Sequence, residues 1–170
     1  MLYMAFNTNT KMHTKKLSGF TLIELLVVIS IIGILSTLAV VSLNNARAKA
    51  RDAKRVSDMK QVQTALELFL SDRNGYPAGN GIILGSASAA SLSETNAFAA
   101  TTAGTLYMGN VPSNPAPGGT NYVYTSYTNS SKTTVCSATP CAWYEIEFEI
   151  EGQTGGLAAG THTADPTGIN

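Results

Sequence analysis

Residues 16–30 read KLSGFTLIELLVVIS, and the apolar run that begins at Phe20 continues to Leu43 with Glu24 as its only charge. A helix over residues 20–43 is about 36 Å long at 1.5 Å per residue. That length is enough to cross a bilayer core of about 30 Å, so the stretch predicts a membrane-spanning helix. A carboxylate inside such a helix costs about 2.5–3.5 kcal/mol and indicates a functional site unless it snorkels to the interface.

Three interpretations of this segment compete. A cleaved secretory signal has an apolar region of about 7–15 residues, so this run is too long for that class. A plain anchor leaves Glu24 without a role. In the third interpretation the anchor is also processed: Lys15 and Lys16 stay on the cytoplasmic side, and a protease cuts after Gly19. Phe20 then becomes the new N-terminus, with its ammonium group one helical turn from Glu24.

The ordered run of basic leader, Gly19 and FTLIE at residues 20–24 resembles the N-terminus of type IV pilins and of the pseudopilins of type II secretion systems. The resemblance covers residues 15–77, because LELFLSDRNGYP at 66–77 is similar to the end of pseudopilin helices. It implies that a prepilin peptidase cleaves between Gly19 and Phe20 and N-methylates Phe20. It also implies that Glu24 neutralises the amino terminus of an adjacent subunit during filament assembly.

The same resemblance implies a structural subunit, not an enzyme, without a cofactor. Its expected partners are the prepilin peptidase, further copies of itself, other pilin-like subunits, an inner-membrane assembly platform and membrane lipid. Before assembly it would be a single-pass protein of the bacterial cytoplasmic membrane with its C-terminal domain outside the cytoplasm. This N-terminus does not distinguish a pilus from a secretion pseudopilus or a DNA-uptake filament. Val41 stands where many pilins have a proline, and either Met1 or Met12 would start the leader.

The chain divides by composition into successive segments. We expect a leader (1–19), an assembly helix (20–43), an amphipathic helix (44–73), a loop-rich region (74–119), antiparallel strands (120–151) and a flexible tail (152–170). Residues 44–73 lack proline and glycine, and their apolar side chains recur every three or four positions, as in an amphipathic helix. The helix is therefore predicted to continue over residues 20–73, until Asn74-Gly75-Tyr76-Pro77 ends it. Met59 to Phe69 are expected in the core, whereas the alanines at 46–53 suit packing between subunits.

Strand signals follow in the second half of the chain. Residues 78–104 predict a loop with a short helical piece around Ser86–Phe98, and 105–111 and 121–128 predict strands. Residues 132–136 and 142–150 predict a hairpin around SATP. Apolar and acidic side chains alternate over residues 144–150, which is typical of a half-buried antiparallel strand. The expected fold class is α+β: a long N-terminal helix packed on a small antiparallel sheet.

The two cysteines, Cys136 and Cys141, have no neighbouring histidine or further cysteine to complete a metal site. Because they lie between two predicted strands, we interpret them as a disulfide that closes the hairpin, with free thiols as the alternative. An extracytoplasmic location favours the disulfide. His13 and His162 lack metal-ligand neighbours, and no catalytic set or phosphate-binding loop is visible. The C-terminal tail offers only Asp165 to a calcium ion, so no metal site is predicted.

Charge is uneven although the formal net charge is zero. Residues 47–60 are basic and 145–151 acidic, which does not predict nucleic-acid binding because the chain as a whole is not basic. The basic cluster is interpreted either as a solvated or lipid-facing surface or as a partner for acids on a neighbouring subunit. Two functions remain as alternatives to the filament subunit: a membrane-anchored extracytoplasmic binding module that does not polymerise, and a secreted protein.

Overall fold

The computed structural model describes residues 19–170. The leader expected over residues 1–19, with Lys15 and Lys16, therefore lies outside the described residues except for Gly19. The chain forms two units, one that ends at Val41 and one from Ser42 to Asn170. The helix α1 contributes to both, and every strand belongs to the second unit.

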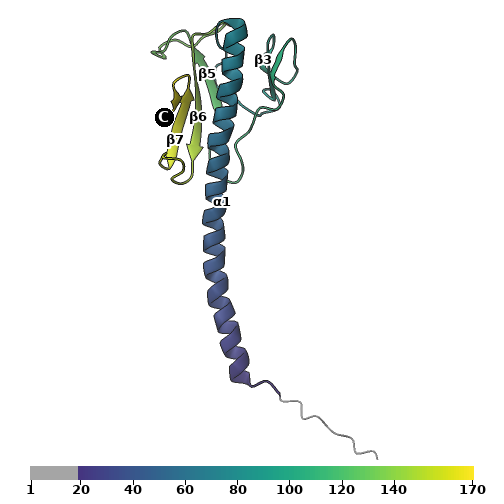
Figure 1. The fold of residues 1–170 in the computed structure, drawn as a ribbon, viewed down its shortest axis with the longest axis vertical. Helices are drawn as coiled ribbons and strands as arrows, with labels where there is room; N and C mark the ends of the chain where they lie inside the picture. Colours follow the sequence, from purple (N-terminus) through teal and green to yellow (C-terminus); the bar gives the residue numbers. More distant parts are fainter. Residues whose placement is uncertain (1–18) are drawn as a thin grey trace, which may run out of the picture. The chain divides into compact units, whose positions relative to one another are not determined.

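Helix α1 extends from Leu22 to Arg73, over 52 residues (Figure 1). Its end follows the predicted breakers, because Asn74 has a φ of 55° and donates its backbone N–H to the carbonyl of Leu70 at 2.8 Å. A left-handed residue directly after the last turn is a common way to end a helix. Gly33 and Val41 lie inside α1 without interrupting it. The predicted continuous helix is thus confirmed, and its membrane and amphipathic parts differ in burial rather than in backbone structure.

Five antiparallel strands form the larger sheet of the second unit, in the order β1-β5-β6-β7-β8. Their bounds are β1 Ile82–Ile83, β5 Val123–Tyr127, β6 Trp143–Ile150, β7 Gly160–Asp165 and β8 Gly168–Ile169. Figure 1 shows β5, β6 and β7 beside the upper half of α1. Strand β6 is central and pairs with β5 on one side and β7 on the other.

The core lies between this sheet and α1. Alternate residues of β6, namely Tyr144, Ile146, Phe148 and Ile150, are at most 1% exposed. The helix contributes Met59, Val62, Ala65, Leu66 and Phe69. Burial of each such side chain contributes about 1.5–3 kcal/mol, so the sheet-on-helix contact supplies most of the driving force for folding this unit. The α+β fold class predicted from the sequence is confirmed.

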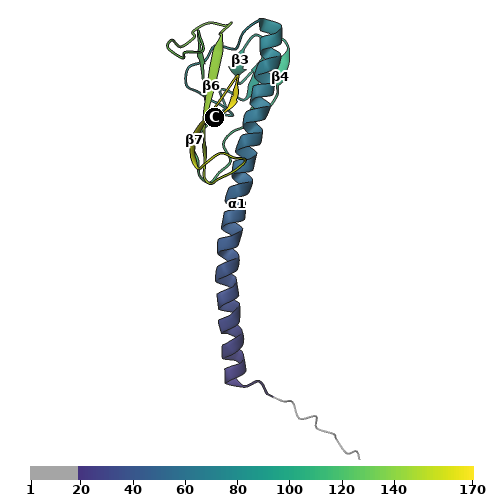
Figure 2. The ribbon, with the colours of Figure 1, turned by 60° about the vertical axis from the view of Figure 1, so that its left-hand side comes forward.

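A second sheet of three strands, in the order β3-β2-β4, lies in the region expected to be a loop. It contains β2 Ser91–Ser93, β3 Ala97–Ala99 and β4 Leu106–Met108, and Figure 2 shows β4 beside α1. The helical piece predicted around Ser86–Phe98 is wrong. Leu92 and Phe98 are direct cross-strand partners and both are buried. Six residues apart on a helix, they would point about 120° apart, so the hairpin is what places them together.

The hairpin predicted between residues 132–136 and 142–150 is also wrong. Strand β6 pairs over five positions with β5, whereas Val135 makes only an isolated bridge to Tyr127. Val135 is 40% exposed, so this segment brings little apolar surface to the core. Tyr124 is fully buried beside Ile146, which explains why β5 takes the edge of β6.

The segment 152–170 differs from the flexible tail expected there, because it contains β7 and β8. Its sequence GTHTAD has no bulky apolar side chain, so the periodicity that reveals a strand is absent. Pairing with β6 supplies the stabilisation instead: β7 matches it over five positions, from Ile146–Ala164 to Ile150–Gly160. The predicted strands at 105–111 and 121–128 correspond to β4 and β5.

Candidate functional site

The first turn of α1 holds Glu24 by a capping box. Thr21 lies directly before the helix, and both its backbone N–H (2.8 Å) and its hydroxyl (2.7 Å) donate to Oε2 of Glu24. The N–H of Glu24 donates in return to the Thr21 hydroxyl oxygen at 3.3 Å. A carboxylate also suits the positive end of the helix dipole. The sequence signal for this arrangement, Thr-x-x-Glu before an apolar run, is present at 21–24, and the interpretation of Glu24 from sequence missed it.

The capping box uses only one of the two carboxylate oxygens. Among the described residues, Oε1 of Glu24 accepts no hydrogen bond, and both bonds from Thr21 go to Oε2. The side chain is thus fixed in direction while one oxygen stays available. A cation that approaches from outside the chain, such as an ammonium group, can bind there without displacing the cap.

Gly19 and Phe20 precede the helix and are exposed, with Phe20 81% exposed. A Cβ built on Gly19 would have no atom within 4 Å, so no packing in the described chain requires glycine at this position. The peptide bond between these residues is therefore sterically open to a protease. Any requirement for glycine here would come from a molecule outside the chain.

From Leu22 to Leu43, no other part of the described chain covers the helix. All residues of this segment are exposed in the single chain, including large apolar side chains such as Leu25, Ile32 and Leu38. Within residues 19–170, α1 is the one helix long and apolar enough to cross a membrane, with a mean hydropathy of 2.7 over its apolar window. An apolar surface of this size requires lipid or other protein around it.

Three of the four hydroxyl side chains in this segment are satisfied within the helix itself. Ser30, Ser36 and Thr37 donate to the backbone carbonyls of Leu26, Ile32 and Ile34 at 2.8, 2.7 and 2.8 Å. In hydrocarbon an unpaired hydroxyl costs several kcal/mol, and bonding to the preceding turn removes that cost. Most of the segment therefore suits an apolar environment; Glu24 is its one charge, and Ser42, near its end, makes no side-chain hydrogen bond among the described residues.

In the second unit, part of the basic cluster 47–60 pairs within the chain, unlike either predicted arrangement. Arg55 and Asp52 are fully buried and lie 2.6 Å apart, and Arg55 also lies 2.7 Å from Glu151. Arg51 binds Glu151 through two bonds of 2.8 and 2.5 Å. The backbone N–H groups of Glu151 and Gly152 donate to Asp52. These contacts fasten the end of β6 to α1.

The same guanidinium binds the loop at 112–119. Arg55 donates to the side-chain oxygen of Asn114 at 2.7 Å and to the carbonyl of Gly118 at 2.8 Å. Gly119 has a φ of 75°, and a Cβ there would lie 2.9 Å from the Arg55 guanidinium, so this close approach favours glycine. The partners are about sixty positions from Arg55 in the chain, and no local sequence pattern could have indicated them.

The hydrogen bonds from Arg51, together with the nearby charge of Arg55, lower the pKa of Glu151 from 4.5 to about 2. A second contact joins Lys54 to Asp58 at 3.0 Å, and Asp58 accepts a hydrogen bond of 3.1 Å from the buried hydroxyl of Tyr122. Burial and the Asp58 charge raise the pKa of Tyr122. At neutral pH Glu151 is therefore ionised and Tyr122 is neutral, so their contacts in the network persist.

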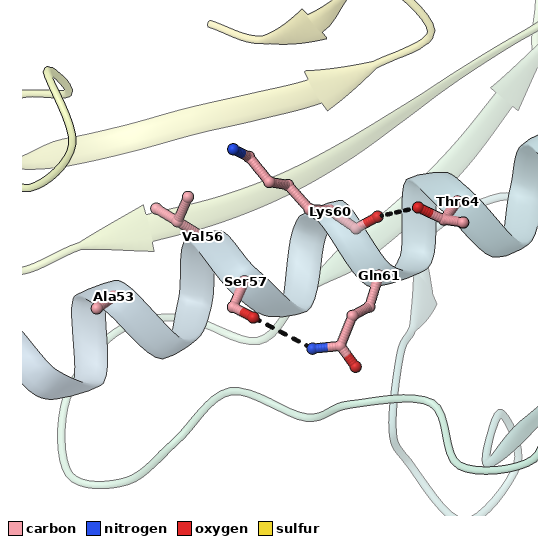
Figure 3. Close-up of a pocket in the computed structure, with 6 residues that line it drawn as sticks. All are labelled: Ala53, Val56, Ser57, Lys60, Gln61 and Thr64. Atoms are coloured by element: carbon pink, nitrogen blue, oxygen red, sulfur yellow. Dashed lines mark hydrogen bonds between the residues drawn. The ribbon is translucent and has the colours of Figure 1, made fainter.

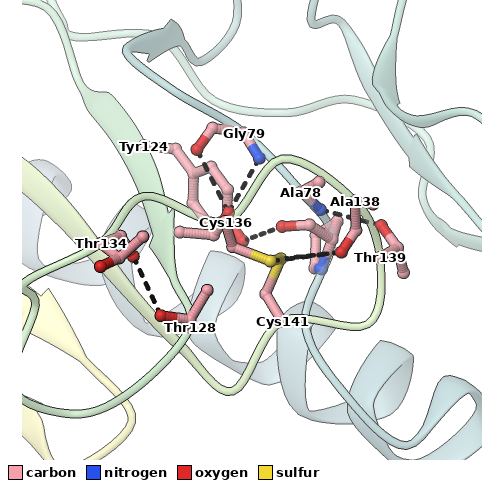
Figure 4. Close-up of a disulfide and its surroundings, with 11 residues drawn as sticks. Ala78, Gly79, Tyr124, Thr128, Thr134, Cys136, Ala138, Thr139 and Cys141 are labelled. Carbon is pink, nitrogen blue, oxygen red and sulfur yellow. Dashed lines mark hydrogen bonds between the residues drawn. A yellow bond between two sulfur atoms is a disulfide. The ribbon is translucent and has the colours of Figure 1, made fainter.

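Cys136 and Cys141 form a disulfide in the loop between β5 and β6 (Figure 4). Cys141 also exchanges two backbone hydrogen bonds with Tyr76, of 2.8 and 2.9 Å. The N–H of Ala78 donates to the hydroxyl of Thr139 at 2.9 Å. The bonded loop thus holds the chain where it leaves α1, rather than closing the predicted hairpin.

Polar groups elsewhere do not form a metal centre in the described part of the chain. No group of three or more histidine, cysteine or acidic side chains is close enough to hold a metal ion within residues 19–170. His162 contacts the carbonyl oxygens of Ala158 and Asn170, and Asp165 accepts hydrogen bonds from Thr167. His13 lies outside the described residues.

Comparisons with known proteins bear on the N-terminal segment. Residues 14–40 match the prokaryotic N-terminal methylation motif. The chain is 44% identical over 66 residues to the type II secretion system core protein G of Aeromonas hydrophila. The aligned residues make up 39% of this chain and 46% of that protein. The protein of the same name from Escherichia coli K12 is 43% identical over 67 residues, with the same coverage.

A type IV major pilin protein, PilA of Myxococcus xanthus, is 36% identical over 58 residues, which cover 34% of this chain and 26% of the pilin. The chain spans less than half the length of these curated relatives. No solved structure matches it.

Proposed function

We propose that this chain is a member of the pilin and pseudopilin family, which its N-terminal segment resembles, and a structural subunit of a type IV pilus-like or type II secretion pseudopilus filament. Members of that family are structural proteins rather than enzymes. The observation that carries the proposal is the bare apolar helix from Leu22 to Leu43, with an open Gly19–Phe20 bond before it and Glu24 one turn inside it.

The proposed sequence of events begins in the bacterial cytoplasmic membrane. A prepilin peptidase hydrolyses the bond between Gly19 and Phe20, which releases the basic leader and leaves an ammonium group on Phe20. The same enzyme transfers a methyl group to that nitrogen from a sulfonium methyl donor, which leaves as a thioether, while one N–H proton passes to solvent. The apolar helix stays in the membrane as a single span, and residues 44–170 lie outside the cytoplasm, where the bond between Cys136 and Cys141 is stable.

Assembly then exchanges lipid around the helix for the helices of neighbouring copies, on an inner-membrane assembly platform and with further pilin-like subunits. Glu24 pairs with the methylated ammonium group of an adjacent subunit. Oε1 is the oxygen available for that contact, since Thr21 occupies Oε2. Opposite charges in hydrocarbon attract strongly, so the carboxylate that is costly in a single helix stabilises the assembled one.

The test is a substitution at the cleavage site. Gly19→Phe fits the open space around the Gly19 Cβ position, so it leaves the rest of the chain folded while it blocks the small pocket expected in the peptidase. In the native host we expect an uncleaved precursor in the membrane and no filaments in the sheared fraction. Gly33→Ala, also in open space, is the matched control and should be processed normally. Normal cleavage and filaments in Gly19→Phe would overturn the proposal and favour a non-polymerising anchored module.

A further inference from the structure

Several charged side chains of the second unit have no ion pair inside the chain. Most basic side chains of the second unit have an acidic partner: Arg51, Lys54, Arg55, Arg73 and Lys132. In the described part of the chain, Arg47, Lys49 and Lys60 on α1 have no ion pair. Two acids of the same helix also have none, but their carboxylates accept hydrogen bonds from tyrosine hydroxyl groups: Glu67 from Tyr76 and Asp72 from Tyr107. Among the described residues, Glu147 and Glu149 have neither an ion pair nor a side-chain hydrogen bond. The unpaired cations lie on α1 and these two unpaired carboxylates lie on β6.

The outward face of the five-stranded sheet is acidic. Glu147 and Glu149 point away from the core, on the face opposite Ile146 and Phe148. Their cross-strand neighbours are uncharged, namely Val123, Thr161 and Thr163. Lys132 lies near this face but is bound to Glu145 at 3.1 Å. Glu147 and Glu149 lie on the same face of one strand, so their like charges repel each other, and a cation from outside the chain would relieve that repulsion.

Lys49 and Lys60 share one exposed side of α1. They are eleven residues apart, so at 100° per residue their directions differ by about 20° and their positions by about 16 Å along the axis. Small side chains lie between them, and part of this surface is a shallow cleft lined by Ala53, Val56, Ser57, Lys60, Gln61 and Thr64 (Figure 3). Small side chains allow another surface to approach the helix closely.

We infer that, in the filament, the outward face of the five-stranded sheet of one copy docks on the Lys49–Lys60 face of α1 of the next copy. This inference rests on the proposed function. The occupant is a second copy because the acidic face complements the basic helix face of the same chain and repels another acidic face. Such a contact joins two different surfaces, and a head-to-tail contact that does not close into a ring repeats into an open filament.

The spacing permits the contact. Glu147 and Glu149 are about 7 Å apart along the strand, less than the separation of the two lysines along α1. Each ammonium group is carried on a flexible four-carbon stem, and the two stems can lean toward each other to reach the carboxylates. The contact therefore needs no change in the backbone of either copy.

Two charge-reversed variants of the full chain test the inference in the native host. In Glu147→Lys/Glu149→Lys both surfaces are positive, and in Lys49→Glu/Lys60→Glu both are negative. Each variant alone should form at least about tenfold fewer filaments than the wild type, because like charges then meet at the contact. Expressed together, the two variants should recover filaments that contain both, since each sheet face then meets a helix face of opposite charge.

The neutral variant Glu147→Gln/Glu149→Gln is the control and should lose fewer filaments than the reversed one. Leader removal and formation of the Cys136–Cys141 disulfide show that each variant is processed and folded. Filaments at the wild-type level in either reversed variant, or no recovery on co-expression, overturn the inference. If only Lys49→Glu/Lys60→Glu loses filaments and co-expression does not restore them, the two lysines contact lipid instead. A wild-type chain that is cleaved yet forms no filaments overturns the proposed function itself, and the inference with it.

Discussion

Glu24 combines two roles that a single substitution can separate. Its carboxylate caps the first turn of α1 through Thr21, and in our proposal its charge binds the amino terminus of a neighbour. Glutamine retains the oxygen and the size that a capping box needs, but it carries no charge. The cap therefore explains why an acid or amide is placed here, and the charge explains why the position is acidic.

We expect Glu24→Gln to be inserted and cleaved like the wild type and to form at least about tenfold fewer filaments, because the ammonium group of the next subunit loses its counter-charge. The measurement compares precursor and mature chain on a gel with the amount of sheared filament. The control is Thr21→Ala, which removes the hydroxyl of the cap while the charge stays. If Glu24→Gln assembles as well as the wild type, capping alone accounts for the residue.

Arg55 is the residue on which the lower part of the second unit depends. Replacing it by leucine leaves Asp52 buried without a counter-charge and leaves the side-chain oxygen of Asn114 without its donor. We expect the free energy of unfolding to fall by about 3–5 kcal/mol, measured by chemical denaturation of the full chain in detergent. Lys49→Leu is the matched control and should change it by less than about 0.5 kcal/mol. An equal, small effect of both would show that the buried pair contributes little.

The pair between Arg51 and Glu151 predicts how stability depends on pH. The pKa of Glu151 is about 2 in the folded state, below its ordinary value of 4.5. A lowered pKa means that the charged form stabilises the folded state, so the contribution is present above about pH 5 and is lost as the pH falls through 4.5 toward 2. Denaturation between those pH values should show this decline, and Arg51→Gln should make it shallower. A variant with the wild-type slope would contradict the assignment.

At the scale of the elements, β6 connects the two features that organise the second unit. Its inward residues fill the core against α1, and its outward residues carry the acidic face. Phe148→Ala should lower the free energy of unfolding by about 3–5 kcal/mol, because it leaves a cavity in a fully buried position. Its outward neighbour Glu147→Ala should be close to neutral in the same denaturation experiment, and a comparable loss there would contradict the orientation of β6.

How well each element could be predicted depended on how much apolar surface it carries. The long helix and β6 have strong periodic patterns, and the sequence predicted both. Strand β7 has no bulky apolar side chain and is held by backbone pairing, so no periodicity reveals it. Strand β6 pairs with β5 rather than with residues 132–136 because β5 carries Tyr124, which is buried in the core, whereas Val135 is largely exposed. Which of the two segments is buried is a property of the tertiary structure.

The candidate site divides in the same way. Gly19, Phe20 and Glu24 lie in one local motif, so residue order located them, and the resemblance to pilins and pseudopilins implied their proposed roles. The capping role of Thr21 was also readable from its spacing to Glu24. The pairing of Arg55 with Asp52 and the loop at 112–119 joins residues far apart in the chain, and the structure was needed to find it.

At the scale of the whole molecule, the chain consists of an apolar helical segment that needs a partner and a folded unit that carries complementary charges on different faces. In our account both features serve polymerisation: the first after cleavage at Gly19, the second between folded units. The central claim is therefore that residues 16–24 are a processing and assembly signal and not a simple anchor.

Intact-mass measurement of the mature protein, purified from the native host, tests that claim most directly. The account predicts a chain that begins at Phe20, carries one added methyl group and retains the whole apolar helix. Peptide fragmentation should place the methyl group on the Phe20 nitrogen. A mature chain that still contains residues 1–19, or one that begins beyond about residue 40, would contradict the account: the former would indicate an uncleaved anchor and the latter a conventional secretory signal.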